Sequence, residues 1–136
     1  ERELDQALQE KIWLKSGGFL IIQQTEAFVA IDVNTGKHSS KKDAEENYKL
    51  INREAALEIA RQLRLRNLSG MILVDFINMK NTNDQSELLQ YMGSLVRSDP
   101  MQTVVVDVTA LGIMEITRKK SAKTLAEQLL QLKKGE

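Results

Sequence analysis

Short runs of apolar and β-branched residues alternate with polar turns in the first third of the chain. Two such runs, Phe19 to Gln24 and Phe28 to Val33, have the length and composition of strands. Thr25-Glu26-Ala27 separates them, which is short enough for an antiparallel hairpin. Ser16-Gly17-Gly18 is a turn signal before the first run. This part of the chain is therefore predicted to be rich in strands.

A long amphipathic helix is predicted after Asp43. Glu46 follows three residues later, an arrangement typical of a helix capping box. Asn67 and Gly70 are expected to end the helix. Its apolar residues recur every three or four positions and form one stripe: Ala44, Tyr48, Ile51, Ala55, Ile59 and Leu63.

Strand and helix patterns alternate through the rest of the chain. Met71 to Ile77 and Thr103 to Val108 are almost continuously apolar, which predicts central strands buried on both faces. Between them, Asp84 repeats the capping pattern and opens a helix that is expected to end near Arg97. The segment from Leu111 to Thr117 is ambiguous between strand and helix.

Helices are also expected over the first ten residues and over residues 121–136. Strands that alternate with helices indicate the α/β class. The predicted architecture is a single layered domain, with a mixed β-sheet flanked by helices.

Composition supports a globular domain, because the 136 residues are 42% hydrophobic and 28% charged. No apolar run approaches the ~18 residues of a membrane span. The absence of cysteine excludes disulfides and thiolate metal sites, and it is compatible with a reducing, cytoplasmic setting. The net charge is zero and so does not by itself indicate a polyanionic partner. Since the sequence begins ERELDQALQE, without Met, it is expected to be part of a longer protein.

Three aspartates interrupt apolar runs of strand character: Asp32, Asp75 and Asp107. A carboxylate at such a position is costly unless it is paired, hydrogen-bonded or bound to a cation. Two of them on neighbouring strand ends would make a hard-oxygen site for Mg²⁺ or Mn²⁺. Each could instead cap a loop or pair with an arginine, and the pattern alone does not select which two come together.

The strings around two of these aspartates are more specific. AIDVNTGK at 30–37, NREAALEIARQLRLRNLSG at 52–70 and ILVDFINMK at 72–80 resemble the ribonuclease E/G family, which consists of bacterial endoribonucleases that act on single-stranded RNA. The resemblance extends to LGIMEITRKK at 111–120 and so covers most of the chain. It implies that residues 1–136 are the deoxyribonuclease-I-like catalytic subdomain of such an enzyme.

The resemblance also implies a site. Asp32 and Asp75 match the two aspartates that hold the catalytic Mg²⁺ in the family, with Mn²⁺ as an alternative ion. Asn34 matches an asparagine of the same active site, and its amide would orient a water or a phosphate. The implied reaction is hydrolysis of RNA phosphodiester bonds to 5′-phosphate and 3′-hydroxyl ends, in RNA processing or decay.

This sequence departs from the family pattern at several points. Asn78 stands where the family often has a second aspartate, which would leave the site one charge weaker. The family resemblance assigns no role to Asp107, because its surroundings differ. Relatives also carry an oligonucleotide-binding barrel and a pocket for the RNA 5′ monophosphate, which cannot fit within these residues. The zinc-binding cysteine pair that usually follows this region has no counterpart here.

Two basic groups are candidates for RNA contact. Lys37, Lys41 and Lys42 directly follow the Asp32 loop, and this adjacency favours contact with RNA phosphates over a solvated loop. The second group matches a basic run of the family, although a solvated face is its default interpretation: Arg118, Lys119 and Lys120.

The aromatic residues Trp13 and Phe19 could stack on a base, but aromatics beside a Gly-Gly turn more often cover a core edge or a domain interface. The expected partners are single-stranded RNA, upstream RNA-binding domains of the same chain and a second copy in a homo-oligomer. The alternative to an enzyme is a non-catalytic RNA-binding or assembly module that keeps the fold. Only the enzyme requires Asp32 and Asp75 to converge on one divalent ion.

Overall fold

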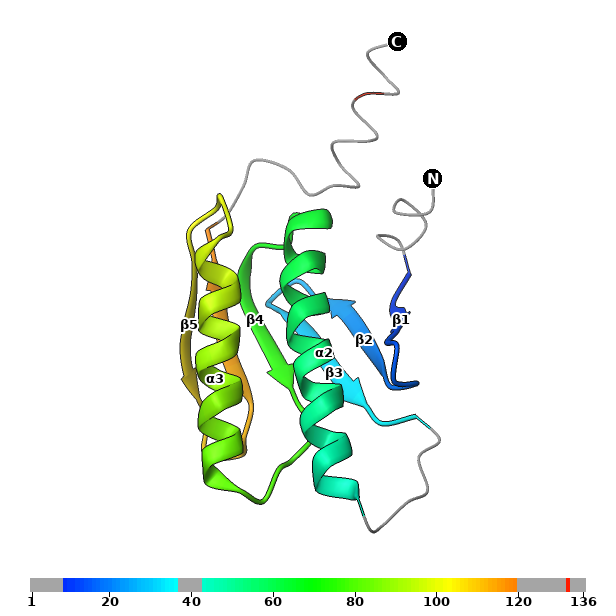
Figure 1. The fold of residues 1–136 in the computed structure, drawn as a ribbon. Coiled ribbons are helices and arrows are strands. Elements are labelled where there is room, and N and C mark those ends of the chain that lie inside the picture. Colours follow the sequence, from blue (N-terminus) through cyan, green and yellow to red (C-terminus); the bar gives the residue numbers. More distant parts are fainter. Residues whose placement is uncertain (1–8, 37–42, 120–131, 133–136) are drawn as a thin grey trace.

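A six-stranded sheet forms the body of the computed structural model, which describes residues 9–36, 43–119 and 132 (Figure 1). In the sheet the strands follow the order β1-β2-β3-β4-β6-β5. Strands β3 and β4 run parallel, and the other neighbouring pairs are antiparallel, so the prediction of a mixed α/β sheet is confirmed. The strands are β1 (Lys11–Trp13), β2 (Phe19–Gln24), β3 (Val29–Asn34), β4 (Gly70–Asp75), β5 (Thr103–Val108) and β6 (Met114–Arg118).

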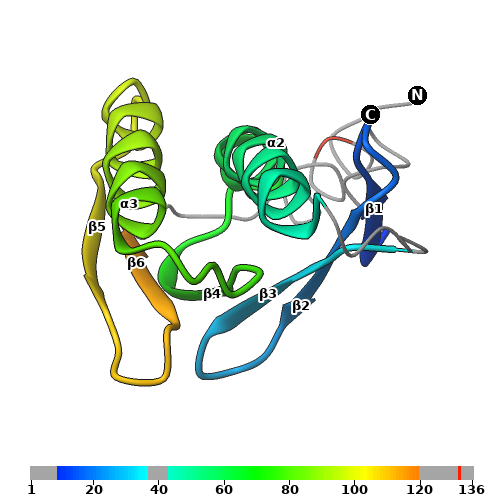
Figure 2. The ribbon, with the colours of Figure 1, turned by 60° about the horizontal axis from the view of Figure 1, so that its bottom comes forward.

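Two helices cover one face of this sheet, α2 (Ala44–Leu65) and α3 (Thr82–Arg97) (Figure 2). Helix α2 leads from β3 to β4 and is the crossover that a parallel pair requires. Helix α3 lies beside α2 and leads to β5. Among the described residues, no helix is both long enough and apolar enough to cross a membrane.

The core lies between the sheet and the two helices. On β3 and β4 the buried residues alternate with residues of the uncovered face, because successive strand side chains point to opposite sides. Ile31, Ile72 and Val74 are at most 1% exposed. From the helices, the core receives chiefly Ile51, Ala55, Ala56, Ile59, Leu63, Met92 and Val96.

The prediction that β4 and β5 are buried on both faces is wrong. Met71 on β4 is 44% exposed, because it lies on the face that the helices leave open. Strand β5 is an edge strand, and its Val104 is 47% exposed. A continuous apolar run therefore does not mean burial on both faces in this sheet.

Several element boundaries also differ from the prediction. The ambiguous segment is strand β6, and it lies between β4 and β5, whereas β1 was not predicted at all. Asp43 makes no capping hydrogen bond with its side chain. Asn81, rather than Asp84, caps α3, because its side chain accepts from Asn83 N at 2.8 Å and Asp84 N at 3.3 Å. The helices predicted at the two ends fall almost entirely outside the described residues.

Close backbone packing fixes the loops at the carboxyl end of β3. Gly36 has a φ of +71°, and a Cβ atom there would lie 2.3 Å from Gly17 O. A Cβ atom on Gly18 would lie 2.8 Å from Asn34 O. After β4, Ile77 is held by the fully buried Asn52 of α2, which donates to its carbonyl at 2.9 Å and accepts from its N–H at 3.0 Å. The segment after β3 is therefore held by close backbone packing, and the segment after β4 by two hydrogen bonds.

Gly36→Ala should destabilise the fold by more than about 1 kcal/mol, because it adds a Cβ clash to a positive φ. Gly93→Ala is the matched control: it lies in α3 with nothing within 4 Å of its added Cβ, and it should stabilise by about 0.5–1 kcal/mol. Urea denaturation of both variants measures the difference. Equal effects of the two changes would contradict the close approach of the loops.

Candidate active site

Asp32 and Asp75 are direct neighbours in the sheet. The parallel register of β3 and β4 pairs these two residues, and neighbouring strands lie about 4.8 Å apart. Asp75 is the last residue of β4, and Asp32 lies two residues before the end of β3. Both are exposed on the face that the helices leave open. The fold therefore selects this pair from the three candidate aspartates.

The environment of Asp75 disfavours its ionised form. Partial burial raises the pKa of Asp75 above its usual value, and the negative charge of Asp32 raises it further. Among the residues that the structure describes, no lysine or arginine forms an ion pair with either carboxylate. Like charges held side by side without a counter-charge make a position at which a cation would stabilise both ionised groups.

Asn34 completes the group. It lies two residues after Asp32, hence on the same face of β3, and it is half-buried. Its Nδ2 donates to Asp32 Oδ2 at 3.2 Å. Within residues 9–36 and 43–119 no hydrogen bond reaches its Oδ1, so this oxygen can still bind a ligand.

The donors of this site fit a hard divalent ion. Across the described parts of the chain, no cluster of three or more histidine, cysteine, aspartate or glutamate residues could hold a metal. Mg²⁺ is commonly bound by one or two carboxylates, with waters and substrate phosphates as the remaining ligands. The Asp32–Asp75 pair with Asn34 supplies that kind of incomplete oxygen site.

The strand order keeps Asp107 away from this group. Strand β6 separates β5 from β4, and Asp107 stands opposite Glu115 and accepts from Val108 N at 2.7 Å. The exposed Asn78 lines a separate cavity of about 120 Å³. Asp32 and Asp75 are not among the residues that line that cavity.

Arg118 occupies a different position from the one expected of an RNA contact. It is 4% exposed, and its Nε donates to Asp99 Oδ2 at 2.7 Å. Its Nη1 donates to Asn67 Oδ1 and to Leu68 O, both at 2.9 Å. The guanidinium at the end of β6 is thus bonded to the loop before β4 and to the loop before β5. This buried structural role replaces the predicted RNA contact of Arg118.

The other basic candidates are less defined. Lys119 is exposed at the end of β6 and remains a candidate for contact with a polyanion. The remaining four lie outside the described residues: Lys37, Lys41, Lys42 and Lys120.

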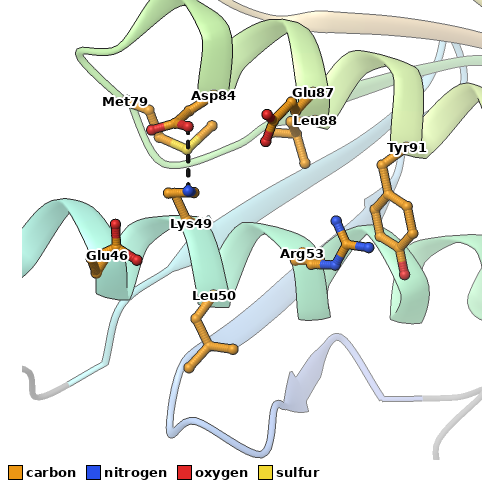
Figure 3. Close-up of a pocket in the computed structure, with 9 residues that line it drawn as sticks. All are labelled: Glu46, Lys49, Leu50, Arg53, Met79, Asp84, Glu87, Leu88 and Tyr91. Carbon is orange, nitrogen blue, oxygen red and sulfur yellow. Dashed lines mark ion pairs between the residues drawn. The ribbon is translucent and has the colours of Figure 1, made fainter.

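The groove between α2 and α3 lies on the helix side of the sheet (Figure 3). Its volume is about 250 Å³. Lys49 forms an ion pair with Asp84 across it at 3.4 Å, and the hydrogen bond and charge of Asp84 raise the pKa of Lys49. Arg53 stacks on Tyr91, with 4.0 Å between its Cζ and the ring centroid. These cations are already paired across the groove, and Asp32, Asn34 and Asp75 do not line it, so the groove is not the catalytic candidate.

The sequence did not predict two residues that lie close to the candidate site or support it. Asn52, which holds the segment after Asp75, lies between apolar positions of a helix and gives no local signal. Lys11 lies on β1 beside two aromatic rings. The alternation from Lys11 to Leu14 was the available signal for that strand.

Comparison with known proteins places these residues in a family context. Residues 1–121 match the ribonuclease E/G family. The chain is 43% identical over 122 residues to ribonuclease E of Nostoc sp. PCC 7120, covering 90% of this chain and 18% of that protein. It is 41% identical over 129 residues to ribonuclease G of Escherichia coli K12 and to ribonuclease G of Haemophilus influenzae. Each of these matches covers 95% of this chain and 26% of the relative. The chain thus spans about a quarter or less of these relatives.

Asp75→Asn should raise the melting temperature in metal-free buffer at pH 7. Because the pKa of Asp75 is raised on folding, the folded state binds this proton more tightly, and stability falls as pH rises through that pKa. The gain should vanish near pH 3, where the wild-type carboxyl is protonated in both states. Glu26→Gln, an exposed carboxyl in the β2–β3 turn, is the control and should show no such gain. A lower melting temperature for Asp75→Asn at pH 7 would identify the carboxylate as structural.

Arg118→Met should cost about 3–5 kcal/mol of unfolding free energy at pH 7, because it leaves the buried carboxylate of Asp99 without a counter-charge. Burial alone would raise the pKa of Asp99. The pKa is lowered overall, because Arg118 contributes hydrogen bonds and a positive charge, and Met101 and Thr103 donate further hydrogen bonds. The stability from this pair should therefore be lost as pH falls below the usual range of an aspartate. Lys119→Met should change stability by less than about 0.5 kcal/mol. Similar losses from the two changes, in chemical denaturation, would refute the structural role.

Proposed function

We propose, because this chain belongs to the ribonuclease E/G family, that it is the catalytic subdomain of an endoribonuclease that hydrolyses single-stranded RNA with Mg²⁺. The observation that carries the proposal is the register of β3 and β4, which makes Asp32 and Asp75 neighbours on the uncovered face of the sheet. The names of the relatives, ribonuclease E and ribonuclease G, support RNA as the substrate.

Asp32 and Asp75 would hold the ion through their carboxylate oxygens. When bound there, Mg²⁺ supplies Lewis acidity toward a phosphate oxygen and lowers the pKa of a bound water. Mn²⁺ prefers the same oxygen donors and is an alternative. The ion would also relieve the repulsion that raises the pKa of Asp75.

The chain's own residues would orient the reacting groups. Asn34 fixes the carboxylate of Asp32 through its Nδ2, while its Oδ1 can accept a hydrogen bond from the attacking water. In the reaction the water oxygen bonds to phosphorus, and the bond from phosphorus to the 3′ oxygen breaks. The attacking water gives up one proton and the 3′ oxygen takes one up, so that one product ends in a 3′-hydroxyl and the other in a 5′-phosphate.

RNA binding would depend largely on the rest of the protein. The chain covers 18% to 26% of the relatives compared, and its net charge is zero. Positioning of the reacting groups can supply about 7–11 kcal/mol of the barrier reduction. The 136-residue chain alone should therefore bind RNA weakly, with a steep salt dependence, and cleave it very slowly.

One observation favours the second candidate, a non-catalytic RNA-binding or assembly module. No third acidic or histidine ligand joins the aspartate pair in the described residues, and the exposed Asn78 lies where the family often has an acid. Such a module would bind RNA without needing a divalent ion. Dependence of activity on both aspartates distinguishes the two functions.

In the longer protein that carries this chain, Asp32→Asn and Asp75→Asn should each reduce RNA cleavage more than about 100-fold, since even the outer partners of metal ligands contribute about 10–100-fold. RNA binding in the absence of metal should be unchanged or slightly stronger, because a negative charge is removed. Glu26→Gln, which lies in the β2–β3 turn, should leave cleavage unchanged. Cleavage of a labelled single-stranded oligoribonucleotide, with denaturation curves for each variant, measures this. Full activity of Asp32→Asn would exclude the mechanism.

A further inference from the structure

An aromatic and cationic group lies on the uncovered face beside the aspartate pair. The ring centroids of Trp13 and Phe19 are 5.1 Å apart, with the planes tilted by 58°. Lys11 Nζ lies 4.3 Å from the Trp13 centroid and 4.2 Å from the Phe19 centroid. The register of β1 and β2 pairs Trp13 with Phe19, so these side chains belong to one face of the sheet.

Trp13 is unusually open to solvent for its type. It is 62% exposed, although tryptophan offers more apolar surface than most side chains and is usually well covered. The ammonium of Lys11 covers part of the rings, which is favourable but leaves the indole largely accessible. An aromatic surface of this size is available to a ligand or to a partner.

The group opens into a cavity of about 630 Å³. Six of the residues that line it are Lys11, Trp13, Ser16, Phe19, Asn34 and Gly36. The cavity is therefore continuous with the candidate active site through Asn34. The register places Phe19 directly opposite Asn34, one strand away, and Ile21 opposite Asp32 in the next row.

The charge of this cavity suits a nucleic acid. Of the described residues that line it, Lys11 is a cation and none is an acid. The groove between α2 and α3 differs, because Glu46, Asp84 and Glu87 line it together with its cations. An anionic backbone is thus accepted more readily beside Trp13 than on the helix side.

We propose that Trp13 and Phe19 form a stacking subsite for the base of a nucleotide that flanks the cleaved phosphodiester, and that Lys11 pairs with a phosphate of the same strand. The subsite rests on the proposed function, since it takes RNA as the substrate. Aromatic side chains stack on any base, and a lysine nearby follows the backbone, so the subsite binds single strands without strong sequence preference. A base-paired strand could not present its base faces in this way.

The single tryptophan of the chain makes the subsite directly observable. The emission of Trp13 is recorded during titration of the 136-residue chain with a 5′-labelled ten-nucleotide oligo(U) or oligo(A) at low salt. Anisotropy of the label measures binding independently. Stacking predicts quenching of Trp13 with the same midpoint as the anisotropy change, and weaker quenching by an abasic strand of equal length.

Matched variants separate the base from the backbone. Trp13→Ala should weaken binding of oligo(A) by about 5- to 100-fold, the range expected for loss of one stacked base. Trp13→Phe should restore most of that affinity, because phenylalanine keeps a ring face. Lys11→Met should reduce the slope of the logarithm of the binding constant against the logarithm of the salt concentration by about one. Val104→Ala, an exposed apolar residue on the opposite edge strand, should change neither.

The possible outcomes separate a failure of the stacking subsite from a failure of the proposed function. Binding by anisotropy without quenching, or with full affinity in Trp13→Ala, would overturn the subsite and leave the proposed function intact. No binding by either readout, even at low salt, would overturn the subsite, whereas the proposed function is tested separately by cleavage in the longer protein. Emission that shifts to the blue with protein concentration in the absence of RNA would assign Trp13 to an interface between copies and overturn the subsite. Equal melting temperatures of the variants and wild type exclude misfolding as the cause.

Discussion

The parallel pairing of β3 with β4 is the constraint on which the candidate site depends. It sets Asp32 against Asp75 near the carboxyl ends of two adjacent strands, where burial on one side and repulsion from Asp32 raise the pKa of Asp75. A parallel pair needs a long crossover, and α2 provides it while burying its apolar stripe on the sheet. The same helix carries Asn52, which holds the segment that follows Asp75. Core packing and site geometry are therefore parts of one arrangement.

The distribution of the helices gives the sheet two different faces. Both helices pack on one side, so alternate strand residues on the other side are free to meet a ligand. Along that face the aspartates lie in the middle, the Lys11, Trp13 and Phe19 group lies toward one edge, and exposed valines lie on the other edge. A metal-dependent nuclease needs such an accessible acidic centre with supports for a strand beside it. One face of the sheet therefore forms the buried core with the helices, and the other face is accessible to a ligand.

Much of this arrangement could be predicted from the sequence, because periodicity reports local structure. The hairpin of Phe19 to Val33 and the helix after Asp43 follow from their patterns. The sheet order, with β6 between β4 and β5, could not be predicted, since it arises from pairing between distant segments. The same holds for Arg118, whose partner Asp99 is 19 residues away in sequence and is brought close only by folding. Three aspartates were candidates for the site, and only the register selects two.

Paramagnetic Mn²⁺ titration of the 136-residue chain, followed by NMR, tests the central claim most directly. If Asp32 and Asp75 hold one ion, the amide signals of Asp32, Asn34 and Asp75 broaden together at low Mn²⁺, and excess Mg²⁺ restores them. Broadening should be weaker for Asp107 on β5, two strands from β4, and weakest for Glu26 in the distant hairpin turn. Broadening that spreads over all exposed acids at once, or that leaves Asp32 and Asp75 unaffected, would contradict a shared metal site.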